Sequence, residues 1–225
     1  MTYRNLFPVL LLLAPVSLSG ALHGQEVLTP DLNGITTGQG WTLVNRAATV
    51  TIEDGRPVVS FDARVGDGAA WLDGVDFHNG TIEVRIRGKN VPQRSFVGVA
   101  FRGVDDVTYD AVYFRPFNFL ADNALSRSHH VQYISHPAHT WFTLRRDHTG
   151  VYENEIVNPP DPDGFFTARI EIAKPDIRVF VNDAVEPSLV VRELTDRVAG
   201  RVGLWMGNGS DGAFAELVLR PTGSP

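Results

Sequence analysis

Five polar side chains that could hold a small hydroxylated ligand fall on three neighbouring segments of the sequence. The segments are 96–102, 109–115 and 129–135, and apolar and polar residues alternate along each of them. Successive side chains of an extended strand point to opposite faces, so the polar members of the three segments can share one surface. We predict that this surface is formed by the following residues above the small residues Gly98 and Ala100: Arg102, Tyr113, Arg115, His130 and Gln132.

These side chains suit a carbohydrate. Guanidinium groups donate hydrogen bonds, an amide both donates and accepts them, and aromatic rings offer apolar faces to the C–H groups of a sugar. Trp141 follows a His- and Pro-rich stretch that is typical of a loop, and it is a further candidate because its ring could stack on a pyranose. Trp71 and Trp205 are expected in the core. The alternative is a solvated outer face on which arginine stems cover apolar surface.

Cleavage of a glycosidic bond is a second hypothesis. Hydrolysis requires two carboxyl groups, about 5 Å apart for retention or roughly 6.5 to 9.5 Å apart for inversion. Glu153 and Glu155 are two positions apart, so in an extended segment both would face the same way at about 7 Å. His130 or Glu153 would act as general base or acid, and Arg102 or Arg115 would stabilise developing charge. The alternative is a polar loop ahead of the next pair of prolines.

Two regions contain residues that can ligate a divalent cation. His136 and His139 have a spacing that zinc ligands can use, although a loop leaves their geometry unconstrained. Asp105, Asp106 and the loop 207–212 offer hard oxygen ligands, which suit calcium. An ordinary Gly-rich hairpin turn is the alternative to the calcium site. Calcium is therefore a candidate cofactor, and no metal is assigned.

Composition excludes several classes of function. The chain has 225 residues, no cysteine and a formal net charge of −6, and its basic residues form no block. A nucleic-acid partner is not expected, because a surface that neutralises phosphates is missing. The lack of cysteine excludes thiol catalysis, iron–sulfur clusters and Cys-ligated zinc. The sequence contains neither the Gly-x-Ser-x-Gly string of serine hydrolases nor a phosphate-binding Gly-rich loop.

Short segments with a period of two, separated by Gly, Asn and Asp, dominate the sequence after residue 40. Asp54 and Gly55 join two of them and predict a type I′ hairpin. Only 192–199 could hold a turn or two of helix. Strands are predicted over 49–53, 58–61, 81–88, 96–102, 109–115, 129–135, 165–173, 177–182, 189–191, 201–206 and 213–220. Sheets with so many strands must stack or close, and we predict an all-β, two-sheet antiparallel jelly-roll sandwich with almost no helix.

The strand sequences resemble those of the concanavalin A-like lectin/glucanase superfamily. The resemblance covers residues 40–221 in strand order and is carried by segments 77–87, 96–102, 109–116, 200–205 and 213–219. It is strongest to bacterial laminin-G-like domains and to the 3-keto-disaccharide hydrolase (DUF1080) group. It implies a curved jelly roll whose concave sheet holds sugar.

The sequence departs from these relatives at two motifs. The Glu-x-Asp-x-(x)-Glu motif of the superfamily's glucanases does not occur in this sequence. The strand that begins at Ser95 has Ser-Phe-Val-Gly-Val where the keto-disaccharide hydrolases have an Asn-Ser-Gly-Ile-like sequence. The resemblance therefore points to glycans without establishing catalysis.

The first 21 residues predict a secretory signal peptide. Arg4 precedes the apolar run 6–18, and the small residues 19–21 follow it. The run is too short and too interrupted by proline to cross a membrane, and no transmembrane anchor is expected. The alternative is a buried or interfacial N-terminal helix. We expect a leader over 1–21, a lead-in segment over 22–40 and a single sandwich domain over 41–225, in a periplasmic or secreted protein.

The sequence supports three hypotheses of function. The leading hypothesis is an exported carbohydrate-recognising domain that binds a glycan on its concave sheet through Arg102, Tyr113, Arg115, Gln132 and Trp141. The second is a glycoside-cleaving enzyme, a hydrolase or lyase of the 3-keto-disaccharide type, with His130 and Glu153 as catalytic residues. The third is a non-catalytic interaction domain.

Overall fold

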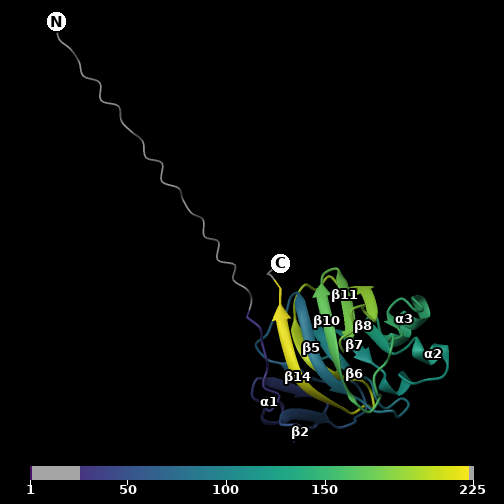
Figure 1. Ribbon diagram of the computed structural model, residues 1–225. Helices are drawn as coiled ribbons and strands as arrows, with labels where there is room; N and C mark the ends of the chain where they lie inside the picture. The colour runs from purple at the N-terminus through teal and green to yellow at the C-terminus, as the bar shows by residue number, and fades with distance from the viewer. Residues whose placement is uncertain (2–25, 223–225) are drawn as a thin grey trace.

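Two seven-stranded antiparallel sheets pack face to face in the computed structural model, which describes residue 1 and residues 26–222 (Figure 1). The predicted all-β jelly-roll sandwich is therefore confirmed. Apart from Met1, the predicted leader over 1–21 lies outside the described residues.

The front sheet has the strand order β1-β4-β13-β6-β7-β8-β9, and the back sheet has the order β12-β11-β10-β5-β14-β3-β2. The front strands are β1 Trp41–Val44, β4 Gly68–Leu72, β13 Arg201–Met206, β6 Val97–Gly103, β7 Asp110–Phe114, β8 Val131–Ser135 and β9 Glu153–Asn154. The back strands are β12 Leu189–Arg192, β11 Asp176–Val181, β10 Phe165–Ala173, β5 Gly80–Arg87, β14 Gly212–Pro221, β3 Arg56–Phe61 and β2 Ala48–Glu53. Strands far apart in sequence become neighbours, and β13 lies between β4 and β6.

The hairpin between β2 and β3 shows how local turn chemistry sets the strand register. Asp54 and Gly55 connect the two strands with φ angles of 49° and 76°. A type I′ turn requires positive φ at both central positions, and its twist matches that of the flanking strands. The predicted hairpin is confirmed.

The space between the sheets is filled by alternate residues of each strand. The front sheet contributes Val97, Val99 and Phe101 of β6, with Val112, Phe114, Val131 and Tyr133 of β7 and β8. The back sheet contributes Ile82, Val84 and Ile86 of β5. The inward face predicted for β6, β7 and β8 is therefore correct.

The outer face of the front sheet carries a second apolar cluster. Its members are Ala69, Trp71, Ala100, Tyr109, Ala111, Tyr113, Ile134, Leu144 and Trp205. Leu144 comes from helix α3, Trp141–Asp147, so the helix covers part of this face. The middle strands β6, β7 and β8 are consequently buried on both sides. Trp71 and Trp205 are buried as expected, but they lie on this outer face and not between the sheets.

Gly98 allows the central strands of the front sheet to bring two large rings together. It pairs with Trp205 on β13 and with Tyr113 on β7. The Tyr113 and Trp205 rings meet with their centroids 5.2 Å apart. A Cβ atom at position 98 would lie 2.1 Å from the carbonyl oxygen of Val112, so this strand position requires glycine.

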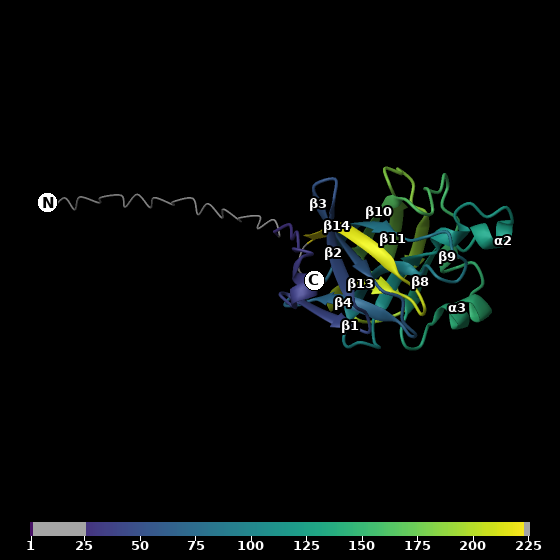
Figure 2. The ribbon, with the colours of Figure 1, turned by 90° about the horizontal axis from the view of Figure 1, so that it is seen from below.

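The described helices are short and lie at the ends of the sandwich. They are α1 Gly34–Thr37, the 3-10 turn η1 Pro116–Asn118, α2 Ala124–Arg127 and α3. Both α2 and α3 lie at the end opposite α1 (Figure 1), and Figure 2 shows them together at that end from below. Thr140 caps α3, since its hydroxyl accepts a hydrogen bond from the Thr143 amide at 3.3 Å. The segment 192–199, which the sequence left open to a turn or two of helix, is irregular after β12.

The described part of the predicted lead-in segment, 26–40, packs against the sandwich. Leu28 exchanges two backbone hydrogen bonds of 2.9 Å with Leu219 of β14. Leu32 and Ile35 are buried in the cluster between the sheets. The hydrophobic core of the sandwich thus begins before residue 41.

We expect Gly98→Ala to lower the free energy of unfolding by about 2 kcal/mol or more, because the added methyl group meets the backbone of β7. Urea unfolding followed by tryptophan fluorescence measures this change.

Gly164→Ala is the matched control, since the atom nearest its Cβ position is 3.3 Å away, on Asp161. It should change the free energy of unfolding by less than about 1 kcal/mol. Equal midpoints for Gly98→Ala and the wild-type protein would contradict the role assigned to Gly98.

Candidate functional site

A pocket of about 550 Å³ opens on the outer face of the front sheet. Its volume lies within the range of about 300–1,000 Å³ that is common for small-ligand sites. The lining is largely aromatic and basic: Phe96, Tyr113, Arg115, Phe117, His129, His136, Trp141, Arg145 and Trp205. The remaining lining consists of Ile134, Gly207 and the polar residues Asp67, Gln93, Asn118, Thr140 and Asn208.

The floor of the pocket is largely aromatic because strands of the front sheet place aromatic side chains on its outer face. Tyr113, Ile134 and Trp205 rise from β7, β8 and β13 and belong to the outer apolar cluster. Phe96 packs edge-on against Tyr113 with the ring centroids 6.1 Å apart. Gly98 and Ala100, predicted as the floor, are buried and are not among the lining residues.

Three of the predicted site residues form one hydrogen-bonded group. The Tyr113 hydroxyl donates to Gln132 Oε1 at 2.7 Å, and Arg115 Nη2 donates to the Tyr113 hydroxyl oxygen at 2.5 Å. Arg115 Nη2 also donates to Gln132 Oε1. Burial raises the pKa of Tyr113 to about 12, so the phenol stays protonated and serves as a donor. Tyr113 and Arg115 line the pocket, whereas Gln132 lies fully buried.

Glu153 contacts two arginines and a histidine beside the pocket. Arg145 of α3 donates to both of its carboxylate oxygens, at 3.1 and 2.7 Å. His129 Nε2 lies 3.3 Å from the same carboxylate and Arg115 Nη1 lies 3.6 Å from it. Arg145, His129 and Arg115 line the pocket, but Glu153 itself does not.

The predicted pair of Glu153 and Glu155 does not form. The Glu153 side chain is 3% exposed and binds Arg145, whereas the Glu155 side chain is 46% exposed and binds Arg127. The strand β9 ends at Asn154, so the alternation on which the pair depended does not continue to Glu155.

His130 does not share the predicted surface. It precedes β8 and is fully buried, and its Nδ1 accepts a hydrogen bond from the Ile156 amide at 3.1 Å. Its Nε2 therefore carries the proton and donates to the Asn118 carbonyl oxygen at 2.8 Å. Both ring nitrogens are occupied in joining three segments of backbone. Burial lowers the pKa of His130.

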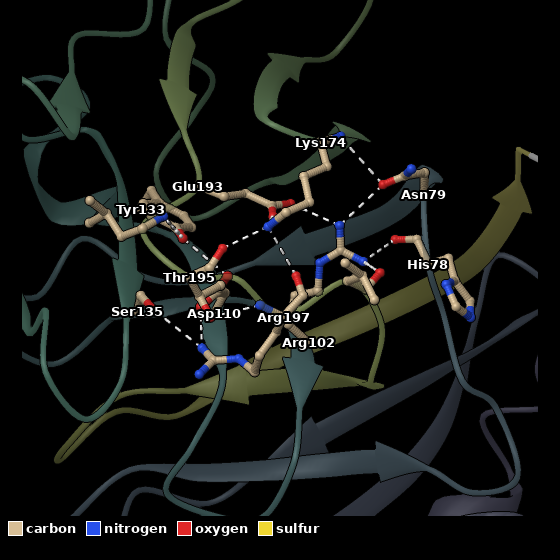
Figure 3. A network of polar contacts seen from close by, with 12 residues as sticks. His78, Asn79, Arg102, Asp110, Tyr133, Ser135, Lys174, Glu193, Thr195 and Arg197 are labelled. Atoms are coloured by element: carbon tan, nitrogen blue, oxygen red, sulfur yellow. Dashed lines mark hydrogen bonds and ion pairs between the residues drawn. The ribbon is translucent and has the colours of Figure 1, made fainter. Parts of the chain in front are cut away.

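Arg102 is also placed elsewhere, because β6 is irregular at this residue. Its φ is 53°, and the pairing of β6 with β13 shifts register here. A bulge re-aims side chains, so the alternation that predicted an outward position fails. Arg102 Nη2 donates to Glu193 Oε1 at 2.9 Å and to Asn79 Oδ1 at 3.1 Å, and Arg102 is 1% exposed (Figure 3).

The network around Arg102 fastens the segment that follows β12 to the front sheet. Glu193 also accepts from Lys174 Nζ at 3.0 Å, and Arg197 Nη2 donates to Asp110 Oδ1 at 2.6 Å (Figure 3). Burial raises the pKa of Asp110, although hydrogen bonds from Ser135 and the charge of Arg197 oppose the shift. These contacts give Arg102 a structural role.

Trp141 stands at the rim of the pocket. It is the first residue of α3, which the sequence did not predict, and it is 48% exposed. Its ring lies under the Arg145 guanidinium, whose carbon is 5.4 Å from the ring centroid. Thus Trp141, Tyr113 and Arg115 reach one pocket, and Gln132 supports the last two from behind.

The sequence reasoning missed four pocket residues that matter chemically: Asp67, His129, Arg145 and Trp205. His129 adjoins the predicted His130, and the start of β8 at Val131 decides which of the two reaches the pocket. Arg145 follows Trp141 by four residues, a helical spacing that would have placed both on one side of a helix.

The side chains of the predicted cation sites are not grouped as metal ligands would be. Within residues 26–222 no group of three or more His, Asp or Glu side chains could hold a metal ion. His136 instead stacks on Tyr109, with the ring centroids 5.0 Å apart. Asp105 Oδ1 accepts from the amides of Val107 and Thr108, at 2.9 and 2.7 Å, and so serves the turn.

Comparison with known proteins supports the fold. No protein-family model and no curated protein matches the sequence of this chain. Among solved structures, the carbohydrate-binding module CBM66 of Bacillus subtilis is similar with a TM-score of 0.55 and 17% identity, over 80% of this chain and 95% of that one. A Bacillus subtilis protein with a galectin-like fold has a TM-score of 0.53 and 10% identity, over 84% and 94%.

The metal-free exoplasmic/lumenal domain of VIP36 is also similar, with a TM-score of 0.54 and 10% identity over 83% of this chain and 87% of that one. At these identities the likeness defines the class of fold, a lectin-like β-sandwich. None of the helices in the described part of the chain has the length and hydropathy of a membrane-spanning segment.

Stability should fall as the pH drops below about 6.5, the ordinary pKa of histidine. Burial lowers the pKa of His130 in the folded state, so the unfolded chain binds the proton more tightly and acid favours unfolding. His129 and His136 are shifted in the same direction by burial. His130→Gln should reduce the slope of unfolding free energy against pH between pH 5 and 7, by at most about 1.4 kcal/mol per pH unit.

Urea unfolding at half-unit pH steps measures these slopes. Measurements at pH 8, where histidine is neutral in both states, give the cost of the substitution itself. A His130→Gln slope equal to that of the wild-type protein would show that His130 does not titrate on unfolding.

Proposed function

We propose that this chain is a carbohydrate-binding domain whose ligand occupies the pocket on the front sheet. The observation that carries the proposal is the composition of the pocket, where aromatic rings and hydrogen-bonding side chains line one hollow. Sugar rings bind by stacking their C–H faces on aromatic rings while their hydroxyl groups bond to polar side chains. Tyr113, Arg115 and Trp141 are assigned to ligand binding, and Gln132 to holding the first two.

The nature of the structural neighbours supports the proposal. CBM66 is a carbohydrate-binding module, and VIP36 has been solved with Ca²⁺ and Man3GlcNAc bound, at a TM-score of 0.50 and 11% identity. From these neighbours we infer for this chain only that a sheet of its lectin-like sandwich binds sugar. The proposal includes the concave-sheet site that the sequence predicts. Export to the periplasm or beyond, expected from residues 1–21, completes it.

The pocket favours binding over glycoside hydrolysis. Of the residues described as lining it, Asp67 is the one carboxylate, and hydrolysis requires two. Glu153 is held by Arg145 and His129, and His130 uses both ring nitrogens in backbone contacts. The two residues assigned to catalysis thus have structural partners and no access to the pocket.

Trp141→Ala should weaken glycan binding about tenfold while the melting temperature stays within about 2 °C of wild type, because the ring is at the rim and half exposed. A glycan array identifies a ligand for the wild-type domain, and isothermal titration calorimetry measures the affinities.

Phe142→Ala is the matched control. Phe142 is the next residue of α3, is 57% exposed and does not line the pocket. Phe142→Ala should weaken binding much less than Trp141→Ala does, because the Phe142 ring touches the Trp141 ring edge-on, with the centroids 5.7 Å apart, but does not reach the pocket itself. An array on which no glycan is retained, with a protein partner recovered from native extracts, would replace the proposal with the interaction-domain hypothesis.

A further inference from the structure

One wall of the pocket is basic. It consists of Arg115, His129 and Arg145, which reach the pocket from the end of β7, the residue pair before β8, and α3. We call these three residues the basic wall. Two guanidinium groups and an imidazole meet here, and arginine keeps its charge at all physiological pH values.

The carboxylate behind the basic wall does not balance it. Glu153 contacts all three members of the wall, and it supplies one negative charge against the two permanent positive charges of Arg115 and Arg145. With His129 neutral the group carries a net charge of +1. Glu155 does not correct this excess, because it pairs with Arg127 at 3.1 Å.

Asp67, the carboxylate that does line the pocket, belongs to a different group of contacts. Its Oδ2 accepts a hydrogen bond from the Tyr109 hydroxyl at 3.1 Å, and Tyr109 stacks on His136. The same hydroxyl accepts from Trp205 Nε1 at 3.0 Å. Asp67 makes no ion pair with the basic wall.

The two arginines of the wall differ in their free donors. Arg115 is 5% exposed, and its guanidinium is committed to the His129 carbonyl oxygen, Tyr113 and Gln132. Arg145 holds Glu153 through Nε and Nη2, and its Nη1 has no hydrogen-bond partner in the described residues. The Arg145 side chain is 31% exposed at the pocket. The second edge of its guanidinium, Nη1 with Nη2, is therefore open to a planar or tetrahedral oxyanion.

We propose that the ligand is an acidic carbohydrate, whose oxyanion group binds the free guanidinium edge of Arg145 beside His129 while a sugar ring stacks on Trp141. This inference rests on the proposed function and specifies its ligand class. The oxyanion chemistry is shared by uronate carboxylates and sulfate esters. Arg145 and Trp141 are adjacent, so the charge and the stacking face are presented together.

The test compares sugars that differ only in charge. Calorimetry with oligogalacturonate, its methyl ester, a sulfated oligosaccharide and its desulfated form separates carboxylate from sulfate recognition. At least one acidic sugar should bind about tenfold more tightly than its neutral counterpart. The difference should shrink as salt rises from 50 to 500 mM, because salt screens the charges.

Arg145→Gln should abolish the preference for the acidic form, and Arg146→Gln is its matched control. Both variants remove one positive charge from α3, but the Arg146 side chain is 59% exposed, pairs with Asp147 and does not line the pocket. If Arg145→Gln fails to fold, Arg145→Lys retains the charge beside Glu153 while losing the guanidinium edge, and it should reduce the preference at least threefold.

The outcomes separate this inference from the proposed function. Neutral sugars that bind as tightly as acidic ones would overturn the inference and leave the binding function standing. A preference for acidic sugars that Arg145→Gln and Arg146→Gln reduce equally would also overturn it. Binding of no sugar by the folded wild-type protein would overturn the proposed function and the inference together.

Discussion

The close approach of β7, β6 and β13 at Gly98 is the constraint on which the pocket depends. With no side chain at Gly98, the rings of Tyr113 and Trp205 meet across it with a centroid separation of 5.2 Å. The two rings belong to the outer apolar cluster, which packs against α3 through Leu144 and forms the aromatic floor of the pocket. The polar groups around Arg115 are then held above a packed apolar surface, and such support keeps the proposed binding site organised in the absence of a ligand.

Much of this arrangement follows from the period of two in the sequence. The alternation in β6, β7 and β8 correctly places Val99, Val112 and Tyr133 on the inner face of the front sheet and Tyr113 on its outer face. It also correctly predicts that Arg115 and Gln132 lie together. The alternation fails where the backbone leaves the strand conformation. Arg102 has a φ of 53°, which redirects its side chain, and His130 precedes the first residue of β8.

The remaining site residues depend on contacts that no local pattern encodes. Asp67 and Trp205 reach the pocket from segments more than 130 residues apart, and only the assembled sheet brings them together. Arg145 lies on a seven-residue helix inside a chain built mainly from strands. Its pairing with Glu153 depends on how α3 docks, which is set by tertiary packing rather than by helix propensity.

The Arg102 network and the basic wall lie on different sides of the front sheet and therefore make different contributions. The network of Arg102, Glu193 and Asp110 is on the side of the sandwich interior and ties the chain after β12 to the sheet. The basic wall stands on the opposite side, and one of its members, Arg145, comes from the short helix α3 at one end of the molecule (Figure 2). One short helix, α3, therefore supplies both the exposed ring of Trp141 and the open guanidinium edge of Arg145, so the character of the proposed ligand is set over little more than one helical turn.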